Sequence, residues 1–216
     1  MGQLKWKDGA VVTLRLRDRS WVLGQLLKSP YLVFFKAFSD SNDWAETAAE
    51  RSDVLFFCAV TRQFLKHSPI ERAKGVAPRV IDKTPERWIK GFLESSRYVT
   101  VWPGKPYERR VLLLGDRPGG KLVSKDLNAS GIQPERVFMP SIPLTDSATI
   151  DAHELDVIWT FPQLNERLLL CKQLSRNVDP LKELTFDRPL PEQCLTFVEI
   201  LGSHGGLADW GYESDA

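Results

Sequence analysis

The segment most suggestive of chemistry is a glycine-rich stretch near the middle of the chain. It reads Gly115-Asp116-Arg117-Pro118-Gly119-Gly120-Lys121 and has the spacing G-x-x-x-x-G-K, in which backbone N–H groups surround a phosphate and the lysine reaches its outer oxygens. The next residue is Leu122, where a serine or threonine hydroxyl would bind magnesium. Residues 121–130 are also too irregular for the helix that would hold the anion. A turn between two strands, 109–114 and 121–123, is therefore the better prediction.

The histidines and cysteines show no pattern of a metal site or a catalytic nucleophile. The three histidines are His67, His153 and His204, and the three cysteines are Cys58, Cys171 and Cys194. No histidine has a partner one helical turn away, and no CxxC pair exists to complete a zinc site. The apolar surroundings of the cysteines predict buried thiols in a reducing compartment, although a Cys–His pair that meets only in space stays open. We therefore expect no metal, no cofactor and no catalytic activity.

The elements at the start of the chain have the patterns of β-strands. Residues 12–17 and 20–27 alternate between two faces, and Gly24 inside the second run predicts a bulge or a bend. Residues 31–35 and 53–61 are apolar throughout, which is typical of strands in a core. The polar stretch between these two has cap residues for a short helix over 44–50.

Helical signals follow at two places. Thr84, Pro85 and Glu86 combine a cap residue, a proline at the first helical position and an acid in the first turn, which predicts a short helix through Phe92. Residues 164–174 carry a continuous apolar stripe and form the most helical segment of the chain.

The remaining segments are predicted as strands and loops. Strands are expected at 98–102, 109–114 and 195–201, and loops over 128–154 with at most a short strand at 137–139. We therefore expect an α+β protein of mainly antiparallel strands, with an SH3-like, partly open barrel at the N-terminus and flanking helices.

Charge is balanced over the whole chain but not along it. The 29 Lys and Arg against 28 Asp and Glu give a net charge of +1, which excludes a uniformly basic nucleic-acid binder and a polyanionic tail. Residues 1–136 hold 24 basic and 15 acidic side chains, or +9, whereas residues 137–216 hold 5 and 13, or −8. Either the acidic part lies over the basic part, or it forms an acidic face that binds a basic partner. The candidate residues of that face are Asp151, Glu154, Asp156, Asp209, Trp210 and Glu213.

Hydropathy favours a cytoplasmic protein. No apolar stretch approaches the roughly 20 residues of a membrane span, and the first seven residues lack the apolar segment of a secretory signal. We expect no membrane partner.

The N-terminal strand pattern resembles the immunity protein 26 family of bacterial polymorphic-toxin systems. The resemblance is carried by residues 7–16, 21–27, 31–35 and 53–60, and by 157–159 with the helix that begins at Leu164. It spans roughly residues 5–175 and implies an immunity-like α+β domain over residues 1–176, followed by an acidic extension over 177–216 that packs on or wraps the body.

The resemblance also implies a function without catalysis. Members of that family would bind a cognate toxin in the cytoplasm and cover its active or substrate-binding surface. An alternative is an adaptor or nucleic-acid-binding module that uses the basic N-terminal part, although the net charge makes nucleic acid the lesser prediction. Nucleotide hydrolysis at residues 115–121 ranks third, and the oligomeric state stays open.

Overall fold

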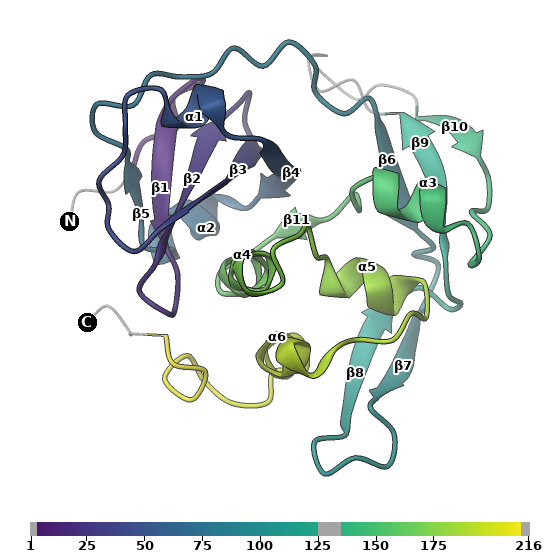
Figure 1. Cartoon of the computed structure of the whole chain (residues 1–216). Coiled ribbons are helices and arrows are strands. Elements are labelled where there is room, and N and C mark those ends of the chain that lie inside the picture. Colours follow the sequence, from purple (N-terminus) through teal and green to yellow (C-terminus); the bar gives the residue numbers. More distant parts are fainter. Residues whose placement is uncertain (1–3, 125–134, 213–216) are drawn as a thin grey trace. The chain divides into compact units, whose positions relative to one another are not determined.

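The computed structural model describes residues 4–124 and 135–212 and divides the chain into two compact units (Figure 1). Unit 1 consists of Met1–Thr84 and Val157–Val178, and unit 2 consists of Pro85–Asp156 and Asp179–Ala216. Each unit is therefore assembled from two segments that are separate in the sequence.

Unit 1 is built around a curled six-stranded sheet. Its strands are β1 (Val11–Arg15), β2 (Trp21–Leu26), β3 (Tyr31–Ser39), β4 (Val54–Val60), β5 (Ile70–Arg72) and β11 (Ile158–Trp159). Their order is β11-β4-β3-β2-β1-β5, and every neighbouring pair is antiparallel except β11 with β4. The sheet forms the partly open, SH3-like barrel that the strand patterns predict (Figure 1).

The core of unit 1 contains side chains from both faces of this sheet. Leu23, Val33 and Phe35 are fully buried on one face, and Phe34 and Phe56 pack together on the other, with ring centroids 5.6 Å apart. The helices of this unit are α1 (Ala48–Arg51), α2 (Arg62–His67) and α4 (Gln163–Gln173). The bulge expected at Gly24 is confirmed, since the β2–β3 register shifts between Val22 and Gly24.

Unit 2 contains a small sheet, a two-stranded ribbon and short helices. The sheet has the order β10-β9-β6, formed by β6 (Arg87–Gly91), β9 (Gly120–Ser124) and β10 (Arg136–Met139). The ribbon pairs β7 (Ser96–Val101) with β8 (Arg109–Leu114). The helices are α3 (Ser147–Ala152), α5 (Pro180–Thr185), α6 (Leu195–Leu201) and the 3-10 helix η1 (Glu192–Cys194). The predicted fold class, α+β with mainly antiparallel strands, is confirmed.

Four local predictions are wrong. Residues 147–152, expected to lie in a loop, form helix α3. The helix expected from Thr84 to Phe92 is instead strand β6, because pairing with β9 places Trp88 beside Val123 and Ile89 beside Leu122. Residues 195–201 are helix α6 rather than a strand. Strand β8 pairs with β7 and not with residues 121–123, which join the other sheet of the unit.

The C-terminal segment, Asp179–Ala216, belongs to unit 2. The indole N–H of Trp102 donates to the carbonyl oxygen of Leu190 at 2.8 Å. Arg109 on β8 pairs with Glu199 on α6, with 2.6 Å between Nη2 and Oε1. Helices that follow residue 178 are thus held to the β7–β8 ribbon by direct contacts.

Cys58, Cys171 and Cys194, all among the described residues, are buried as expected from their apolar surroundings, and they form no disulfide. Within residues 4–124 and 135–212, no helix is long and apolar enough to cross a membrane.

Candidate functional site

The candidate binding residues chosen from the sequence fall in unit 2. Asp151, Glu154 and Asp156 lie in or just after α3, while Asp209 and Trp210 lie in the segment after α6. Glu213 lies outside the described residues. The first three form a short acidic segment, residues 151–156, whose backbone is held at several points.

Backbone contacts with β6 fix the end of the acidic segment. The N–H of Ile89 donates to the carbonyl oxygen of Glu154 at 2.8 Å, and the N–H of Asp156 donates back to the carbonyl oxygen of Ile89 at 2.6 Å. Leu155, between the two acids, is buried and forms a parallel bridge with Ile89. Glu154 and Asp156 are therefore half-buried residues on either side of an anchored leucine.

Helix α5 holds the start of the acidic segment. The ammonium of Lys182, which is buried, donates to the carbonyl oxygen of His153 at 2.9 Å. Arg188 donates to Asp151 Oδ1 at 2.6 Å and lies 3.6 Å from Glu183. The side chain of Asp151 nevertheless remains 63% exposed. The backbone of the segment is thus held by hydrogen bonds at residues 153, 154 and 156.

Burial and the neighbouring charges shift the pKa values of Glu183 and Arg188. Burial raises the pKa of Glu183, and the charges of Arg188 and Lys182 lower it by less, so that the pKa lies above its ordinary value. The hydrogen bond to Asp151 raises the pKa of Arg188, which stays charged at every physiological pH.

Asp209 and Trp210 occupy a different part of unit 2 from the acidic segment. Asp209 accepts a hydrogen bond from the backbone N–H of Gly206 at 2.8 Å and is exposed. Trp210 is half-buried, and its indole N–H donates to the carbonyl oxygen of His204 at 3.2 Å. These contacts close a tight loop after α6, so Trp210 is less available to a partner than its place near the C-terminus suggested.

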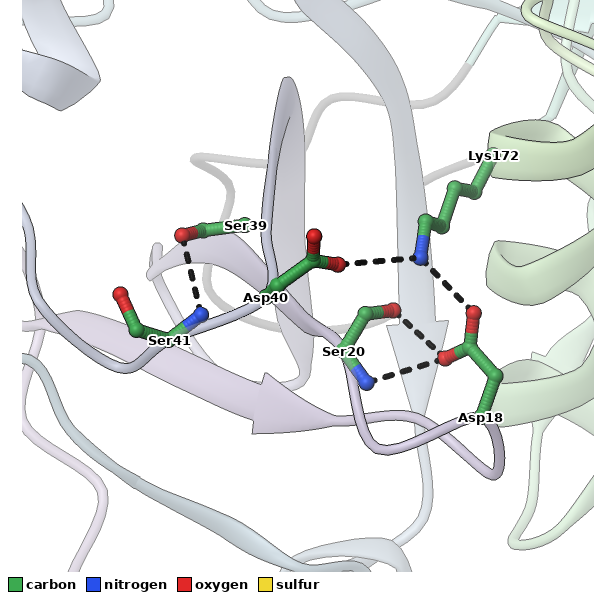
Figure 2. Close-up of polar contacts among 6 residues, drawn as sticks. All are labelled: Asp18, Ser20, Ser39, Asp40, Ser41 and Lys172. Atoms are coloured by element: carbon green, nitrogen blue, oxygen red, sulfur yellow. Dashed lines mark hydrogen bonds and ion pairs between the residues drawn. The ribbon is translucent and has the colours of Figure 1, made fainter.

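A cluster of serine, aspartate and lysine side chains in unit 1 has the residue types of a hydrolytic site (Figure 2). Lys172 on α4 lies 2.8 Å from Asp18 and 3.8 Å from Asp40, and Ser20 donates its hydroxyl to Asp18 at 2.6 Å. Burial raises the pKa of Asp18, but the hydrogen bonds from Lys172 and Ser20 outweigh that effect and leave the pKa below its ordinary value. Lys172 therefore pairs with two carboxylates, and the cluster ties α4 to the β1–β2 turn.

The glycine-rich segment at residues 115–121 connects β8 to β9. A Cβ on Gly115 would lie 2.4 Å from the carbonyl oxygen of Phe92, and its φ of +103° is one that glycine adopts easily. The N–H of Gly119 donates to the carbonyl oxygen of Thr185 at 2.7 Å, and Lys121 pairs with Glu135 at 3.0 Å. Gly115 therefore allows close backbone packing, and two groups that would hold a phosphate, the N–H of Gly119 and the side chain of Lys121, have protein partners.

Charge is divided between the two compact units. Unit 1 contains 17 basic and 10 acidic side chains, or +7, and unit 2 contains 12 and 18, or −6. The imbalance seen along the sequence therefore follows the structural units, with the acidic segment on the negative one.

Among the described residues, no group of three or more His, Cys, Asp or Glu side chains could hold a metal ion.

Comparison with known proteins places this chain in a protein family. Neither the curated proteins nor the solved structures contain a match to this chain. A family model described as a domain of unknown function (DUF8309) matches residues 1–188, which is most of the chain. The chain therefore belongs to the DUF8309 family.

Proposed function

We propose that this protein is a non-catalytic immunity protein that binds and neutralises a cognate bacterial toxin in the cytoplasm. The toxin as partner, and the cytoplasm as the place of action, rest on the resemblance of the N-terminal strands to immunity proteins. The observation that carries the binding role is the acidic segment at residues 151–156, held by β6 and α5 on a unit of charge −6.

A rigid acidic segment suits recognition of a basic surface. A segment whose backbone is already held by hydrogen bonds loses less conformational entropy on binding, which leaves more of the interaction free energy for the complex. A net negative unit also attracts a basic partner over a distance and raises the association rate at low ionic strength. Toxins that act on nucleic acid need basic substrate-binding surfaces, and an acidic inhibitor would cover such a surface.

The direct test mixes the purified protein with the toxin domain encoded beside its gene. We expect a stable complex by gel filtration and loss of toxin activity at equal molar amounts. If the toxin neither co-purifies with the protein nor loses activity, the proposed function is wrong.

A triple variant tests the acidic segment itself. Asp151→Asn, Glu154→Gln and Asp156→Asn together remove three negative charges. We expect the association rate to fall about tenfold at low salt, and by much less at about 1 M salt, where charges are screened within about 3 Å. Stopped-flow fluorescence measures both rates.

The matched control removes three charges from exposed carboxylates of unit 1. Asp43→Asn, Glu46→Gln and Glu50→Gln change the net charge of the chain by the same amount. An equal loss of rate in both variants would assign the effect to net charge alone and contradict a role for the acidic segment.

The positive charge of unit 1 favours a second candidate function, binding of nucleic acid. Seventeen basic against 10 acidic side chains give this unit a charge of +7, and phosphate contacts make binding strongly salt-dependent. Retention on DNA or RNA that falls steeply with salt, together with no effect on the toxin, would favour this candidate.

A further inference from the structure

Two arginines stand in one row across the β10-β9-β6 sheet of unit 2 (Figure 1). Arg136 on β10 and Arg87 on β6 each pair with Ser124 on the central strand β9. Residues that pair directly across antiparallel strands project from the same face of the sheet. This arginine row, Arg87, Ser124 and Arg136, therefore presents a guanidinium group on each side of a serine hydroxyl.

The ring of Phe138 brings the two guanidinium groups together. The guanidinium carbon of Arg87 lies 4.3 Å from the ring centroid, and that of Arg136 lies 4.9 Å from it. Both arginines are exposed, and Phe138 is 39% exposed. Each contact is an attraction between a cation and an aromatic ring. Because one ring attracts both groups, two positive charges are held close together at the surface.

Neither arginine of the row has an acidic partner among the described residues. No carboxylate within residues 4–124 and 135–212 makes an ion pair with Arg87 or Arg136, and the hydroxyl of Ser124 makes no hydrogen bond to any of these residues. Glu135, which precedes Arg136, binds two lysine ammonium groups instead, at 2.5 Å and 3.0 Å. The repulsion between the two guanidinium groups is thus left for an anion from outside the protein to relieve.

The charge and the donors of the row suit a phosphomonoester. A carboxylate carries a single charge and can be bound by one arginine through two parallel hydrogen bonds. A phosphomonoester carries a charge of about −1.5 to −2 at pH 7 and has three strong acceptor oxygens. Two guanidinium groups and one hydroxyl match that charge and that number of acceptors, whereas a carboxylate would leave one arginine unpaired.

The charge of unit 2 argues against a long polyanion as the ligand. The unit holds 12 basic and 18 acidic side chains, or −6. A nucleic-acid strand that continued beyond the row would meet this negative charge and be repelled. Each phosphodiester also carries only one charge, so no single phosphate of a strand would neutralise both arginines. A small ligand with a terminal phosphate avoids both difficulties.

We propose that Arg87, Ser124 and Arg136 form a binding site for the phosphate group of a small phosphomonoester. The guanidinium groups donate charge-assisted hydrogen bonds to the phosphate oxygens, and Ser124 donates its hydroxyl. Phe138 is a positioning residue, because it holds the two arginines over one ring. The site is exposed to water, which screens the charges, so the dissociation constant is expected to be about 1 mM.

An NMR titration with glycerol 3-phosphate tests the site. We expect the backbone amide signal of Ser124 and the Nε–H signals of Arg87 and Arg136 to shift with a dissociation constant of about 1 mM. Acetate, a monoanion, should bind about tenfold more weakly at the same ionic strength. Arg87→Gln combined with Arg136→Gln should weaken binding of glycerol 3-phosphate by at least about tenfold. Circular dichroism checks that the variant remains folded.

The matched control replaces two other exposed arginines of unit 2. Arg110 lies over the Tyr98 ring and Arg117 over the Phe92 ring, each with its guanidinium carbon 4.2 Å from the ring centroid. Arg110→Gln combined with Arg117→Gln removes the same charge and the same kind of ring contact outside the arginine row, and it should bind glycerol 3-phosphate as the wild type does. An equal loss of affinity in both double variants would assign the effect to net charge and overturn the site.

Three further outcomes would overturn the proposal. A titration without shifts at Ser124, Arg87 and Arg136 shows that the row does not bind the phosphate group. Equal affinities for acetate and glycerol 3-phosphate show that the row does not select a dianion. Binding of a short oligothymidylate at the same signals, about tenfold tighter than glycerol 3-phosphate, would make nucleic acid the ligand. None of these measurements involves the toxin or the acidic segment, so the phosphate site and the proposed function are tested separately.

Discussion

Replacing Gly115 by alanine distinguishes backbone packing from phosphate binding as the role of the glycine-rich segment. The new Cβ would lie 2.4 Å from the backbone carbonyl oxygen of Phe92, at a φ of +103°. A residue forced into such a conformation costs about 1–3 kcal/mol, and the backbone must also shift because the contact is with a carbonyl rather than a flexible side chain. We expect Gly115→Ala to lower the free energy of unfolding by about 3 kcal/mol, or the melting temperature by about 6–12 °C for a chain of this length.

Gly104→Ala is the matched control for this experiment. Gly104 also has a positive φ, +76°, but a Cβ there would meet nothing within 4 Å. Alanine at this position therefore carries only the conformational cost of about 1–2 kcal/mol. Thermal unfolding followed by circular dichroism measures both variants. Equal melting temperatures would refute the packing argument, and lost nucleotide binding at unchanged stability would favour a phosphate loop.

Three further predictions concern stability. Arg167 is buried, with its guanidinium carbon 3.8 Å from the Phe56 ring centroid and its Nε 3.0 Å from the carbonyl oxygen of Val178. Arg167→Met should therefore lower the free energy of unfolding, measured by urea titration, by about 2–4 kcal/mol. An unchanged midpoint of unfolding would contradict this prediction. The pKa of Glu183 is raised in the folded state, so ionisation of this residue opposes folding as the pH rises. Glu183→Gln should therefore raise the free energy of unfolding at pH 7, and this gain over the wild type should disappear below about pH 4. A gain in stability that persists at low pH would have another cause. Thr61 caps α2 by accepting a hydrogen bond from the N–H of Phe64 at 3.2 Å, and Thr61→Ala should cost about 1 kcal/mol, whereas Thr61→Ser should restore most of it in the same titration.

The strands of unit 1 could be predicted because their signals are local. Alternation over residues 12–17 and 20–27, and continuous apolar runs in the next two strands, are read directly from neighbouring residues. The helix over 164–174 was equally clear and forms α4, Gln163–Gln173. In each of these segments the period of the sequence and the final burial agree.

Strand β6 shows where local signals fail. Thr84, Pro85 and Glu86 have the chemistry of a helix start, yet pairing of Trp88 with Val123 and of Ile89 with Leu122 makes the segment a strand. Both partners lie more than thirty residues away in the sequence, so no window around Trp88 contains the information. Non-local pairing overrides local propensity here.

The start of helix α5 has a local signal in the sequence. Asp179 accepts a hydrogen bond from the N–H of Lys182 at 3.1 Å, and Pro180 begins the helix. A cap residue followed by proline at the first helical position is a typical helix start.

The contacts that hold the acidic segment could not be predicted from the sequence. The sequence pointed to Asp151, Glu154 and Asp156 through their charge alone. Lys182 and Arg188, which hold this segment, come about thirty residues later and lie in a stretch that was expected to be an extension. Contacts between such distant segments follow from the tertiary fold.

The division of each unit into two sequence segments has a consequence for synthesis. Strands β1 to β5 are complete when Thr84 has been made, but α4, which carries Arg167 onto the Phe56 ring, follows only after residues 85–156. At about 5–20 residues per second, a ribosome needs about 4–14 s for that intervening segment. During this interval the nascent sheet of unit 1 lacks β11 and α4. A chaperone would bind its apolar surface at this stage.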